Sequence, residues 1–355
     1  MRVLALLKYG EKAASTRQRV LQYLPALADA GIEVETRSLI ADDMIGRMRS
    51  PTGIFRAAAA YAGRAIGLAD VRQYDAPWVH KEVFPMAPGA IEGIVARMGV
   101  PLVYDFDDAV FHNYDLHRSG AVRKLLGDRF ASLLGRAQAA FCGNAYLRDY
   151  AARFCDRSII VPTTVDTNVY VPRAPSESGA PVVGWIGSPS TWPSVEPLLP
   201  VLQPLARDGA IRVRIVGSGE AQQRFPEFEM VDWTKQSELS DLQSMDIGIM
   251  PLADTPWNRG KCGFKLIQYM ACGVSTIGSP VGANREIIVE NQNGLFAENL
   301  DDWRDAILAL ARDPVRRAAF GKHGRKWVEA RYSLASQAPV IIDTFASLDR
   351  AGRQS

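Results

Sequence analysis

Short apolar runs alternate with longer amphipathic segments along this sequence, and no other feature limits its possible folds as strongly. The run VLALL at 3–7 is followed by STRQRVLQYLPALADAG at 15–31, where apolar residues recur at helical spacing behind a serine that can cap a helix. The alternation continues to about residue 160. Strands that alternate with helices, several of them uninterrupted apolar runs, predict a parallel sheet covered by helices on both faces.

A stretch without apolar period interrupts this alternation. It reads PTTVDTNVYVPRAPSESGAP and is rich in Pro, Ser and Thr, after which the alternation restarts at VVGWIGS. A chain of 355 residues is also too long for one ordinary domain. We therefore predict a doubly wound domain at 1–165, a linker at 166–180 and a second doubly wound domain at 181–334. The last helical segment, 335–355, could pack on either domain.

The composition excludes several classes of protein. Apolar residues make up 47% of the chain, charged residues 23%, and the formal net charge is +2, which argues against a nucleic-acid binder. The cysteines show no paired spacing and no neighbouring histidine, so we expect buried thiols in a reducing compartment and no structural zinc site; they are Cys142, Cys155, Cys262 and Cys272. The opening MRVLALLKYG is too short for a membrane span, so we expect a cytoplasmic protein.

Positive charge and glycine are concentrated in NRGKCGFKLIQYMACG at 258–273. The preceding DIGIMPL is a predicted strand and FKLIQYMA a predicted helix, so Arg259 and Lys261 lie at the helix N-terminus. The positive end of the helix dipole repels cations at this position unless an anion is bound between them. A diphosphate could accept hydrogen bonds from both the guanidinium and the ammonium group. Gly260 and Gly263 would let the backbone approach the phosphates. The alternative is a solvated basic loop whose glycines serve the turn.

Further glycine turns follow predicted strands in the same half of the chain. VVGWIGS ends in Gly187 and Ser188, and IVGSG ends in Gly217 and Gly219. Ligands of doubly wound sheets bind outside the carboxyl ends of the strands, at such turns and at helix N-termini. Each turn alone could serve packing, but together they predict a nucleotide site in the second domain.

From about 180 to 335 the sequence resembles the nucleotide-sugar domain of glycosyltransferase family four. The matching pieces are GWIGS, VGSG, DIGIMPL, GKCGFKLIQYMACG, SPVGANREII, NGLFA and RRAAFGKHGRKWVEARYS, and the N-terminal half is similar more loosely through KYG, SxRxR at 15–19 and VPTTVDTNVYVP. The resemblance implies the GT-B architecture, two Rossmann-like domains facing across a cleft. It also implies transfer of a sugar, with retention, from a nucleoside diphosphate sugar to a hydroxyl of a glycan or lipid-linked acceptor.

The sequence departs from this family in two places. Relatives carry Glu, seven residues and Glu where this chain has Gly260 and Gln268; the family's second glutamate accepts from ribose hydroxyls, which Gln268 can do through its carbonyl oxygen. Relatives also place Arg and Lys after the first glycine turn, where this chain reads SPSTWPS, so holding the diphosphate falls to Arg259 and Lys261, or to Lys265. The predicted donor-binding residues are Gly187, Ser188, Gly217, Gly219, Gly260, Gly263, Phe264, Lys265 and Gln268.

The charge that develops during sugar transfer indicates which groups the active site needs. Cleavage of the sugar–phosphate bond leaves negative charge on the diphosphate, which fixed donors can stabilise, so we expect no metal and no other cofactor. The metal alternative rests on Asp105-Phe106-Asp107, a D-x-D pattern that suits Mg²⁺ or Mn²⁺ but lies far in sequence from the nucleotide motifs. The predicted strand PLVY carries Asp107 and Asp108 to the crevice. One of them could orient or deprotonate the acceptor hydroxyl, or they could simply begin a helix.

The acceptor side is assigned to the first domain. Gly10, Arg17 and Arg19 follow the first strand, where the arginines could meet an anionic group or form a solvated helix face. A histidine and a lysine in WVHKEVFP follow another strand, and a second histidine lies on the loop after the predicted acids; either histidine could instead be a packed residue. The predicted acceptor-side residues are Gly10, Arg17, Arg19, His80, Lys81 and His112, and the predicted catalytic residues are Arg259, Lys261, Asp107 and Asp108.

The segment 43–72 carries five arginines among alanines and larger apolar residues; they are Arg47, Arg49, Arg56, Arg64 and Arg72. It could lie on anionic lipid at the inner face of the membrane, where a lipid-linked acceptor resides, or pack with its arginines reaching out to water. Two alternatives to a glycosyltransferase stay open: a nucleotide-sugar epimerase of the same fold, and a catalytically silent sugar-nucleotide-binding subunit. The sequence does not favour a dinucleotide oxidoreductase, because no strand runs into G-x-G-x-x-G with an acid about 20 residues on.

Overall fold

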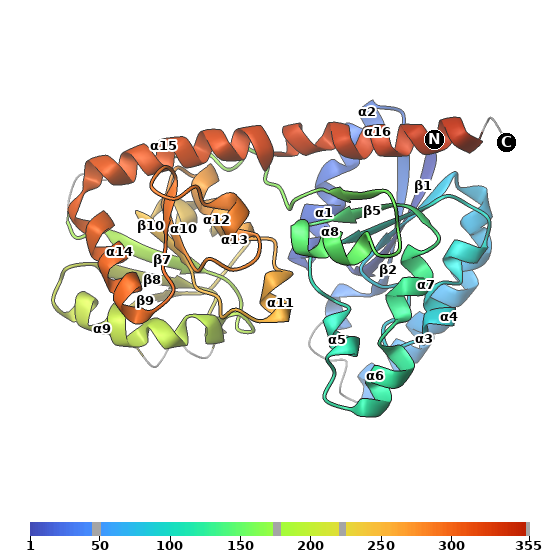
Figure 1. The fold of residues 1–355 in the computed structure, drawn as a ribbon, viewed down its shortest axis with the longest axis horizontal. Coiled ribbons are helices and arrows are strands. Elements are labelled where there is room, and N and C mark those ends of the chain that lie inside the picture. The colour runs from blue at the N-terminus through green and yellow to red at the C-terminus, as the bar shows by residue number, and fades with distance from the viewer. Residues whose placement is uncertain (45–50, 173–178, 220–224, 353–355) are drawn as a thin grey trace. The chain divides into compact units, whose positions relative to one another are not determined.

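The computed structural model describes residues 1–44, 51–172, 179–219 and 225–352. Contacts divide the chain into two units, shown in Figure 1. Unit 1 comprises Met1–Thr163, Gly260–Cys262 and Gln337–Ser355, and unit 2 comprises Thr164–Arg259 and Gly263–Ser336. Each unit contains its own six-stranded sheet in which all pairings are parallel, so the predicted fold of two doubly wound domains is confirmed.

The sheet of unit 1 has the strand order β2-β1-β3-β4-β5-β6. Its strands are β1 (Arg2–Tyr9), β2 (Glu33–Ile40), β3 (Ala76–His80), β4 (Leu102–Phe106), β5 (Ala137–Cys142) and β6 (Ser158–Ile160). Its helices are α1 (Ala14–Arg19), α2 (Leu24–Asp29), α3 (Pro51–Gly67), α4 (Gly89–Glu92), α5 (His112–Asp115), α6 (Gly120–Leu126), α7 (Arg129–Leu134) and α8 (Ala145–Ala151).

Strand β1 explains why this unit folds as its sequence predicts. All five residues of VLALL at 3–7 are buried, because the strand lies inside the sheet and helices cover both of its faces. The chain turns from β1 to β2 on one side and to β3 on the other, so the topological switch point lies between β1 and β3. Residues after the carboxyl ends of these strands are therefore placed where doubly wound folds bind ligands.

The sheet of unit 2 has the strand order β12-β11-β10-β7-β8-β9, with its switch point between β10 and β7. Its strands are β7 (Val182–Ile186), β8 (Arg212–Val216), β9 (Glu229–Val231), β10 (Ile247–Met250), β11 (Ser275–Gly278) and β12 (Gly294–Phe296). Its helices are α9 (Leu199–Arg207), α10 (Glu238–Gln243), α11 (Pro256–Arg259), α12 (Phe264–Ala271), α13 (Asn284–Ile287), α14 (Leu300–Arg312) and α15 (Pro314–Arg331).

Helix α12 is held from both sides by close backbone approaches. A Cβ on Gly248 of β10 would lie 2.3 Å from Cγ of Tyr269, so this glycine makes room for the tyrosine ring. On the other side a Cβ on Gly321 of α15 would lie 1.9 Å from the carbonyl oxygen of Gly273, just after α12. Glycine at these positions lets α12 lie against its neighbours with no intervening side chain.

The last helix, α16 (Leu334–Gly352), settles where the C-terminal segment packs. From Gln337 onward it groups with unit 1, and the first boundary between the units follows Thr163. The fully buried Phe345 packs on Trp78 and Phe141, with ring centroids 5.4 and 6.2 Å away.

Two smaller expectations concern the thiols and the membrane. All four cysteines are free and buried, as predicted. Within the described parts of the chain, no helix has the length and apolar character needed to cross a bilayer.

Candidate functional site

The predicted glycine turns of unit 2 meet at the carboxyl edge of its sheet. Gly217, after β8, has a left-handed φ of 80°, and a Cβ there would lie 2.5 Å from the carbonyl oxygen of Gly187, after β7. Gly219 is also left-handed, and its Cβ would lie 2.8 Å from Cγ of Pro189. The loops that carry Gly187, Ser188, Gly217 and Gly219 are therefore in direct contact, beside the switch point of the sheet.

The start of α12 carries the next group of predicted donor residues. Gly263 precedes the helix with a left-handed φ of 64°, and no side chain caps the first turn. The first turn has no acidic residue either, while Lys265 lies within it, 5.6 Å from the ring centroid of Trp185. Uncapped amide groups, the helix dipole and a lysine together provide a site that favours an anion beside Phe264 and Lys265.

The two predicted catalytic cations fall into different units. Arg259 ends α11 in unit 2 and forms a bidentate ion pair with Asp254, with Nε–Oδ1 and Nη2–Oδ2 distances of 2.6 and 3.0 Å. This hydrogen bonding lowers the pKa of Asp254. Lys261 belongs to unit 1, where its carbonyl oxygen accepts from Nδ2 of Asn144 at 3.0 Å. One edge of the Arg259 guanidinium is thus already occupied by a carboxylate.

The structure gives Gly260 a packing role that sequence analysis did not foresee. A Cβ on Gly260 would lie 2.4 Å from Cβ and 2.7 Å from the amide nitrogen of Ala109, so only glycine fits there. Nearby, the Cys262 thiol donates to the carbonyl oxygen of Asp107 at 3.0 Å. The approach of this backbone to Ala109 accounts for the glycine without any phosphate.

A buried charge cluster lies at the carboxyl edge of the sheet of unit 1. Lys81 adopts a left-handed φ of 68°, and its ammonium lies 2.9 Å from Oδ1 of Asp107 and 2.7 Å from Oδ2 of Asp108. Nε2 of the fully buried His80 lies 3.8 Å from Oδ1 of Asp107. Burial alone would raise the pKa of Asp107, but the Lys81 ammonium, helped by His80 and Arg19, holds it well below its usual range.

These charge interactions distinguish Asp107 from Asp108, which the sequence analysis treated alike. Asp107 stays ionised and is a weak base, so it is unsuited to deprotonate an acceptor hydroxyl. Asp108 is the more exposed of the two and remains a candidate. The first acid of the D-x-D pattern, Asp105, is fully buried and bonded to Arg19 and Trp78, so the pattern does not present two carboxylates to one metal ion.

Arg19, predicted on the acceptor side, is a core residue. It is buried, its Nε donates to Oδ1 of Asp105 at 2.9 Å and its Nη1 to the carbonyl oxygen of Val161. Arg17 folds back onto its own loop, with Nη1 donating to the carbonyl oxygens of Glu11 and Lys12 at 2.8 Å. The assignment of Arg19 to the acceptor is therefore corrected: the helix turns it inward toward the sheet.

The other predicted acceptor residues occupy ordinary packed positions. A Cβ on Gly10 would lie 2.5 Å from Oδ1 of Asp42, which fits a close turn. His112 begins α5 with Nδ1 2.8 Å from Oδ1 of Asp115 and Nε2 2.8 Å from the hydroxyl of Tyr146. Both are partly buried, and neither meets Asp107 or Asp108 in a hydrogen bond among the described residues.

Sequence analysis missed two carboxylate clusters. In unit 1, the buried Glu82 meets Lys8, Tyr114 and Arg129, and Arg129 also pairs with Glu92 at 2.8 Å. Lys8 and Glu82 lie near the carboxyl ends of the neighbouring strands β1 and β3, so the strand order would have suggested their meeting. In unit 2, the carboxylate of Glu238 is bonded to residues of three separate segments, which no local pattern indicates.

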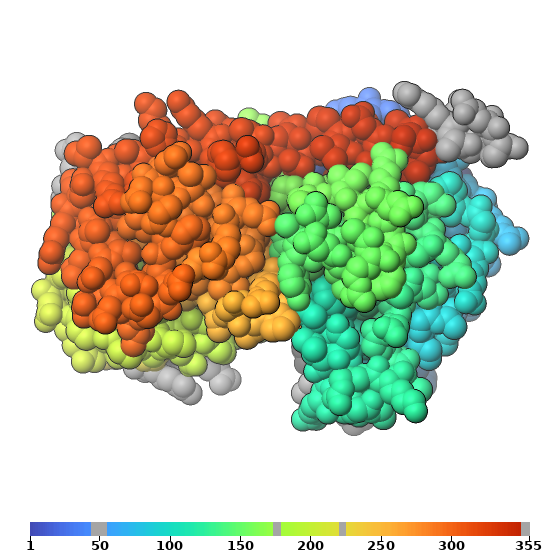
Figure 2. All heavy atoms as spheres, in the orientation of Figure 1, coloured from blue at the N-terminus to red at the C-terminus, as the bar shows by residue number. Residues whose placement is uncertain are grey.

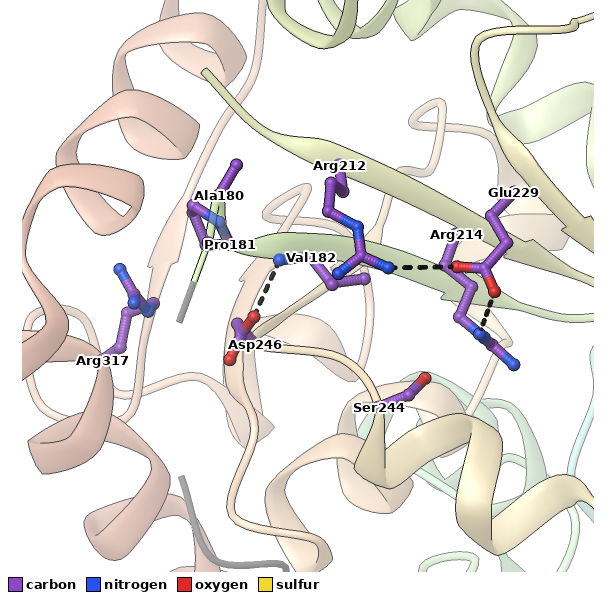
Figure 3. A pocket seen from close by; sticks show the side chains of 10 residues that line it. Ala180, Pro181, Val182, Arg212, Arg214, Glu229, Ser244, Asp246 and Arg317 are labelled. Carbon is purple, nitrogen blue, oxygen red and sulfur yellow. Dashed lines mark hydrogen bonds and ion pairs between the residues drawn. The ribbon is translucent and has the colours of Figure 1, made fainter. Parts of the chain in front are cut away.

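A cavity of about 160 Å³ lies at the opposite, amino edge of the sheet of unit 2 (Figure 3). It is lined by the starts of β7, β8 and β9, and Arg212 and Arg214 both face Glu229 there. Oδ2 of Asp246 accepts from the amide of Val182 at 2.8 Å. Because its charges are largely paired and it lies away from the glycine turns, this cavity is not the predicted donor site.

Residues 180–313 match the model of a family described as glycosyl transferases group 1. No curated protein matches this chain. Similar solved structures include sucrose-phosphate synthase from Thermosynechococcus elongatus (TM-score 0.75, 15% identity, covering 99% of this chain and 100% of that one). HepE from Anabaena, solved with UDP and glucose, has a TM-score of 0.71 and 15% identity over 98% and 100% of the two chains. A glycosyltransferase from Rickettsia africae has a TM-score of 0.71 and 11% identity over 98% of both.

These comparisons bear on both the fold and the resemblance. The structural likeness extends over nearly the whole chain, which confirms the GT-B architecture predicted from the sequence. The family match lies in unit 2 apart from Gly260–Cys262, covers the glycine turns and α12, and confirms the resemblance to glycosyltransferases. Most of unit 2 is therefore similar to a glycosyltransferase domain.

Proposed function

We propose that this glycosyltransferase, in which residues 180–313 match glycosyl transferases group 1, moves a sugar from a nucleoside diphosphate sugar to a hydroxyl of a glycan or lipid-linked acceptor. One observation carries the proposal. The contacting turns at Gly187 and Gly217 and the uncapped start of α12 belong to loops at the carboxyl edge of a single sheet. That edge is where a doubly wound fold binds a nucleotide.

The chemistry of the site follows from the charge of the leaving group. The start of α12, with Lys265 in its first turn, offers fixed positive potential to a diphosphate, and Arg259 and Lys261 remain the proposed further cations. Because these groups could neutralise the leaving diphosphate, we propose that no divalent metal is needed. Retention of configuration is the outcome that the family resemblance supports. HepE, solved with UDP and glucose, makes UDP-sugars the first donors to test.

The test is a donor screen with and without acceptors. UDP, GDP and their sugars are first ranked by thermal shift, since a cognate ligand at 100 times its Kd stabilises a protein by about 2.7 kcal/mol. We expect nucleoside diphosphate release only when a hydroxyl acceptor is present, and no loss of rate with EDTA. Conversion of the donor alone would identify an epimerase, and tight binding without turnover on a broad acceptor panel would identify a silent binding subunit.

We propose a peripheral contact of unit 1 with anionic lipid at the inner face of the membrane. Helix α6, labelled in Figure 1 and reaching the surface of unit 1 in Figure 2, exposes Leu125 by 73% beside the exposed Arg123 and Lys124. The segment first considered, 43–72, contributes less, because Arg64 is buried against backbone carbonyls.

Arg56 pairs with Asp43, and Arg47 and Arg49 lie outside the described residues. Sedimentation with vesicles containing phosphatidylglycerol should be reduced by Leu125→Asp. Equal sedimentation of wild type and variant would refute this contact.

A further inference from the structure

Three consecutive residues before α12, Gly260–Cys262, pack within unit 1 although the residues on either side of them belong to unit 2. The first and the third are held by the loop after β4. A Cβ on Gly260 would lie 2.4 Å from Cβ of Ala109, and the Cys262 thiol donates to the carbonyl oxygen of Asp107 at 3.0 Å. The backbone of this inserted segment is therefore anchored on both sides of its middle residue.

The middle residue, Lys261, is held by the loop after β5. The buried Asn144 caps α8, with Oδ1 accepting from the amide of Leu147 at 2.9 Å, and its Nδ2 donates to the carbonyl oxygen of Lys261 at 3.0 Å. Reversing the side-chain amide would turn its oxygen toward that carbonyl oxygen and lose the cap, so these two bonds fix its orientation. The preceding Gly143 makes room for the segment, because a Cβ there would lie 2.2 Å from Sγ of Cys262.

The side chain of Lys261 differs from its neighbours in exposure. Gly260 and Cys262 are buried, whereas Lys261 is partly exposed, and among the described residues no carboxylate pairs with its ammonium. Two positions further on, Gly263 precedes α12, whose start favours an anion. A lysine carries its charge on a flexible four-carbon stem, so the space that the ammonium can reach depends on where its backbone is held. For Lys261, a side chain of unit 1 holds that backbone.

We infer that Asn144 is a positioning residue for the proposed reaction: it fixes the backbone of Lys261 so that the ammonium can neutralise the diphosphate of the donor. The inference rests on the proposed function and adds to it a residue 117 positions away in the sequence, outside the glycine turns and the basic loop. Attraction between charges weakens as their separation grows. Loss of the Nδ2 donor should therefore weaken the binding of a second phosphate, and only while Lys261 is present.

The experiment compares Kd values for UMP, UDP, GMP and GDP, measured by titration calorimetry on the full chain. Wild type should bind the preferred diphosphate about tenfold or more tightly than its monophosphate, because the second phosphate gains charge-assisted hydrogen bonds. Asn144→Ser keeps an oxygen that can cap α8 and loses the donor to Lys261, so it should reduce this ratio about threefold or more.

A double variant tests whether Asn144 acts through Lys261. Lys261→Ala should also reduce the ratio about threefold or more, and adding Asn144→Ser to it should reduce the ratio no further. A purely structural role for Asn144 would instead weaken mono- and diphosphate alike and leave the ratio unchanged. Asn299→Ser is the matched control, because Asn299 also caps a helix, α14, through its Oδ1, and it should leave the ratio unchanged.

The outcomes separate this inference from the proposal beneath it. If wild type binds none of the nucleotides, or binds mono- and diphosphates equally, the proposed function fails and the inference falls with it. If Asn144→Ser or Lys261→Ala keeps the wild-type ratio, or if Asn144→Ser lowers the ratio as much without Lys261 as with it, the inference is overturned while the proposed function stands. Thermal melts check that Asn144→Ser is folded. Should it not fold, Asn144→Asp, which also keeps a capping oxygen and cannot donate, decides the question in the same way.

Discussion

At the scale of single residues, Lys81 shows how this protein combines strain with charge. Its left-handed backbone would cost about 1–3 kcal/mol, and the buried ammonium would cost more if it were unpaired. Both are offset by the carboxylates of Asp107 and Asp108, which lie within 2.9 Å. The same pairing ties stability to pH, because it holds the pKa of Asp107 below that of the unfolded chain.

The pH dependence can be predicted from that direction. A depressed carboxylate pKa contributes stability above the unfolded value of about 3.9, and this contribution is lost as pH falls toward the folded value. The unfolding free energy of wild type should therefore exceed that of Asp107→Asn by a margin that is full at pH 6 and shrinks steadily from about pH 5 to pH 3. Urea titrations of both proteins across this range measure it, and a margin constant with pH would contradict the ion pair.

The diphosphate assignment makes a second prediction at this scale. Lys265→Ala should reduce kcat/KM for the donor by about 10²–10³, the usual cost of losing a fixed donor to a developing anion. Arg259→Ala and Lys261→Ala should each reduce it more than twofold; if both stay within twofold, these two residues do not hold the diphosphate. Lys322→Ala, exposed on α15, serves as the control and should leave kcat/KM unchanged.

At the scale of elements, the position of α12 depends on how closely other segments approach it. Its N-terminal glycine is left-handed, and its C-terminal end lies against the glycine face of α15. Helix α15 carries two buried glycines, Gly321 and Gly324, that face Gly273 and Met270. Glycine in mid-helix normally weakens a helix, so its presence here indicates that packing outweighs helix propensity.

Two glycine substitutions in helices should accordingly act in opposite directions. Gly321→Ala should lower the unfolding free energy by about 1–3 kcal/mol, because the new methyl would overlap the carbonyl oxygen of Gly273. Gly63→Ala, in α3, should raise it by about 0.5–1 kcal/mol, because nothing lies within 4 Å of that methyl. Urea denaturation tests both; a stabilising Gly321→Ala would show that α15 does not approach α12 as described.

At the scale of the whole molecule, each unit has its own sheet and core, yet the chain is not divided in sequence order. Residues 260–262 and the C-terminal segment from Gln337 group with unit 1, although unit 2 separates both from the rest of unit 1. Unit 1 is therefore complete only after the last helix has been made. Its core includes Phe345 between Trp78 and Phe141.

The contribution of α16 can be measured with one substitution. Phe345→Ala should lower the stability of unit 1 by about 3–5 kcal/mol, the cost of emptying a buried aromatic site. Nucleotide binding by unit 2, followed by calorimetry, should be unchanged under native conditions. Val315→Ala, which removes a largely exposed side chain from α15, should change stability by less than about 0.5 kcal/mol. A stability loss below about 1 kcal/mol for Phe345→Ala would mean that α16 is not part of that core.

Local pattern was sufficient to predict the fold and the glycine turns at the strand ends. The spacing of apolar residues predicts the strands and helices of both sheets. The glycines at the strand ends and the basic loop before α12 are equally local features, and they place Gly187, Gly217 and Gly263 at one edge of the second sheet. Tertiary structure alone decided the rest. It buried Arg19 against Asp105, 86 positions away, lowered the pKa of Asp107 through Lys81, and joined Glu238 to Gln268. Charge and hydrogen bonding act over a few ångströms of space, and which distant residues come that close depends on how the elements pack.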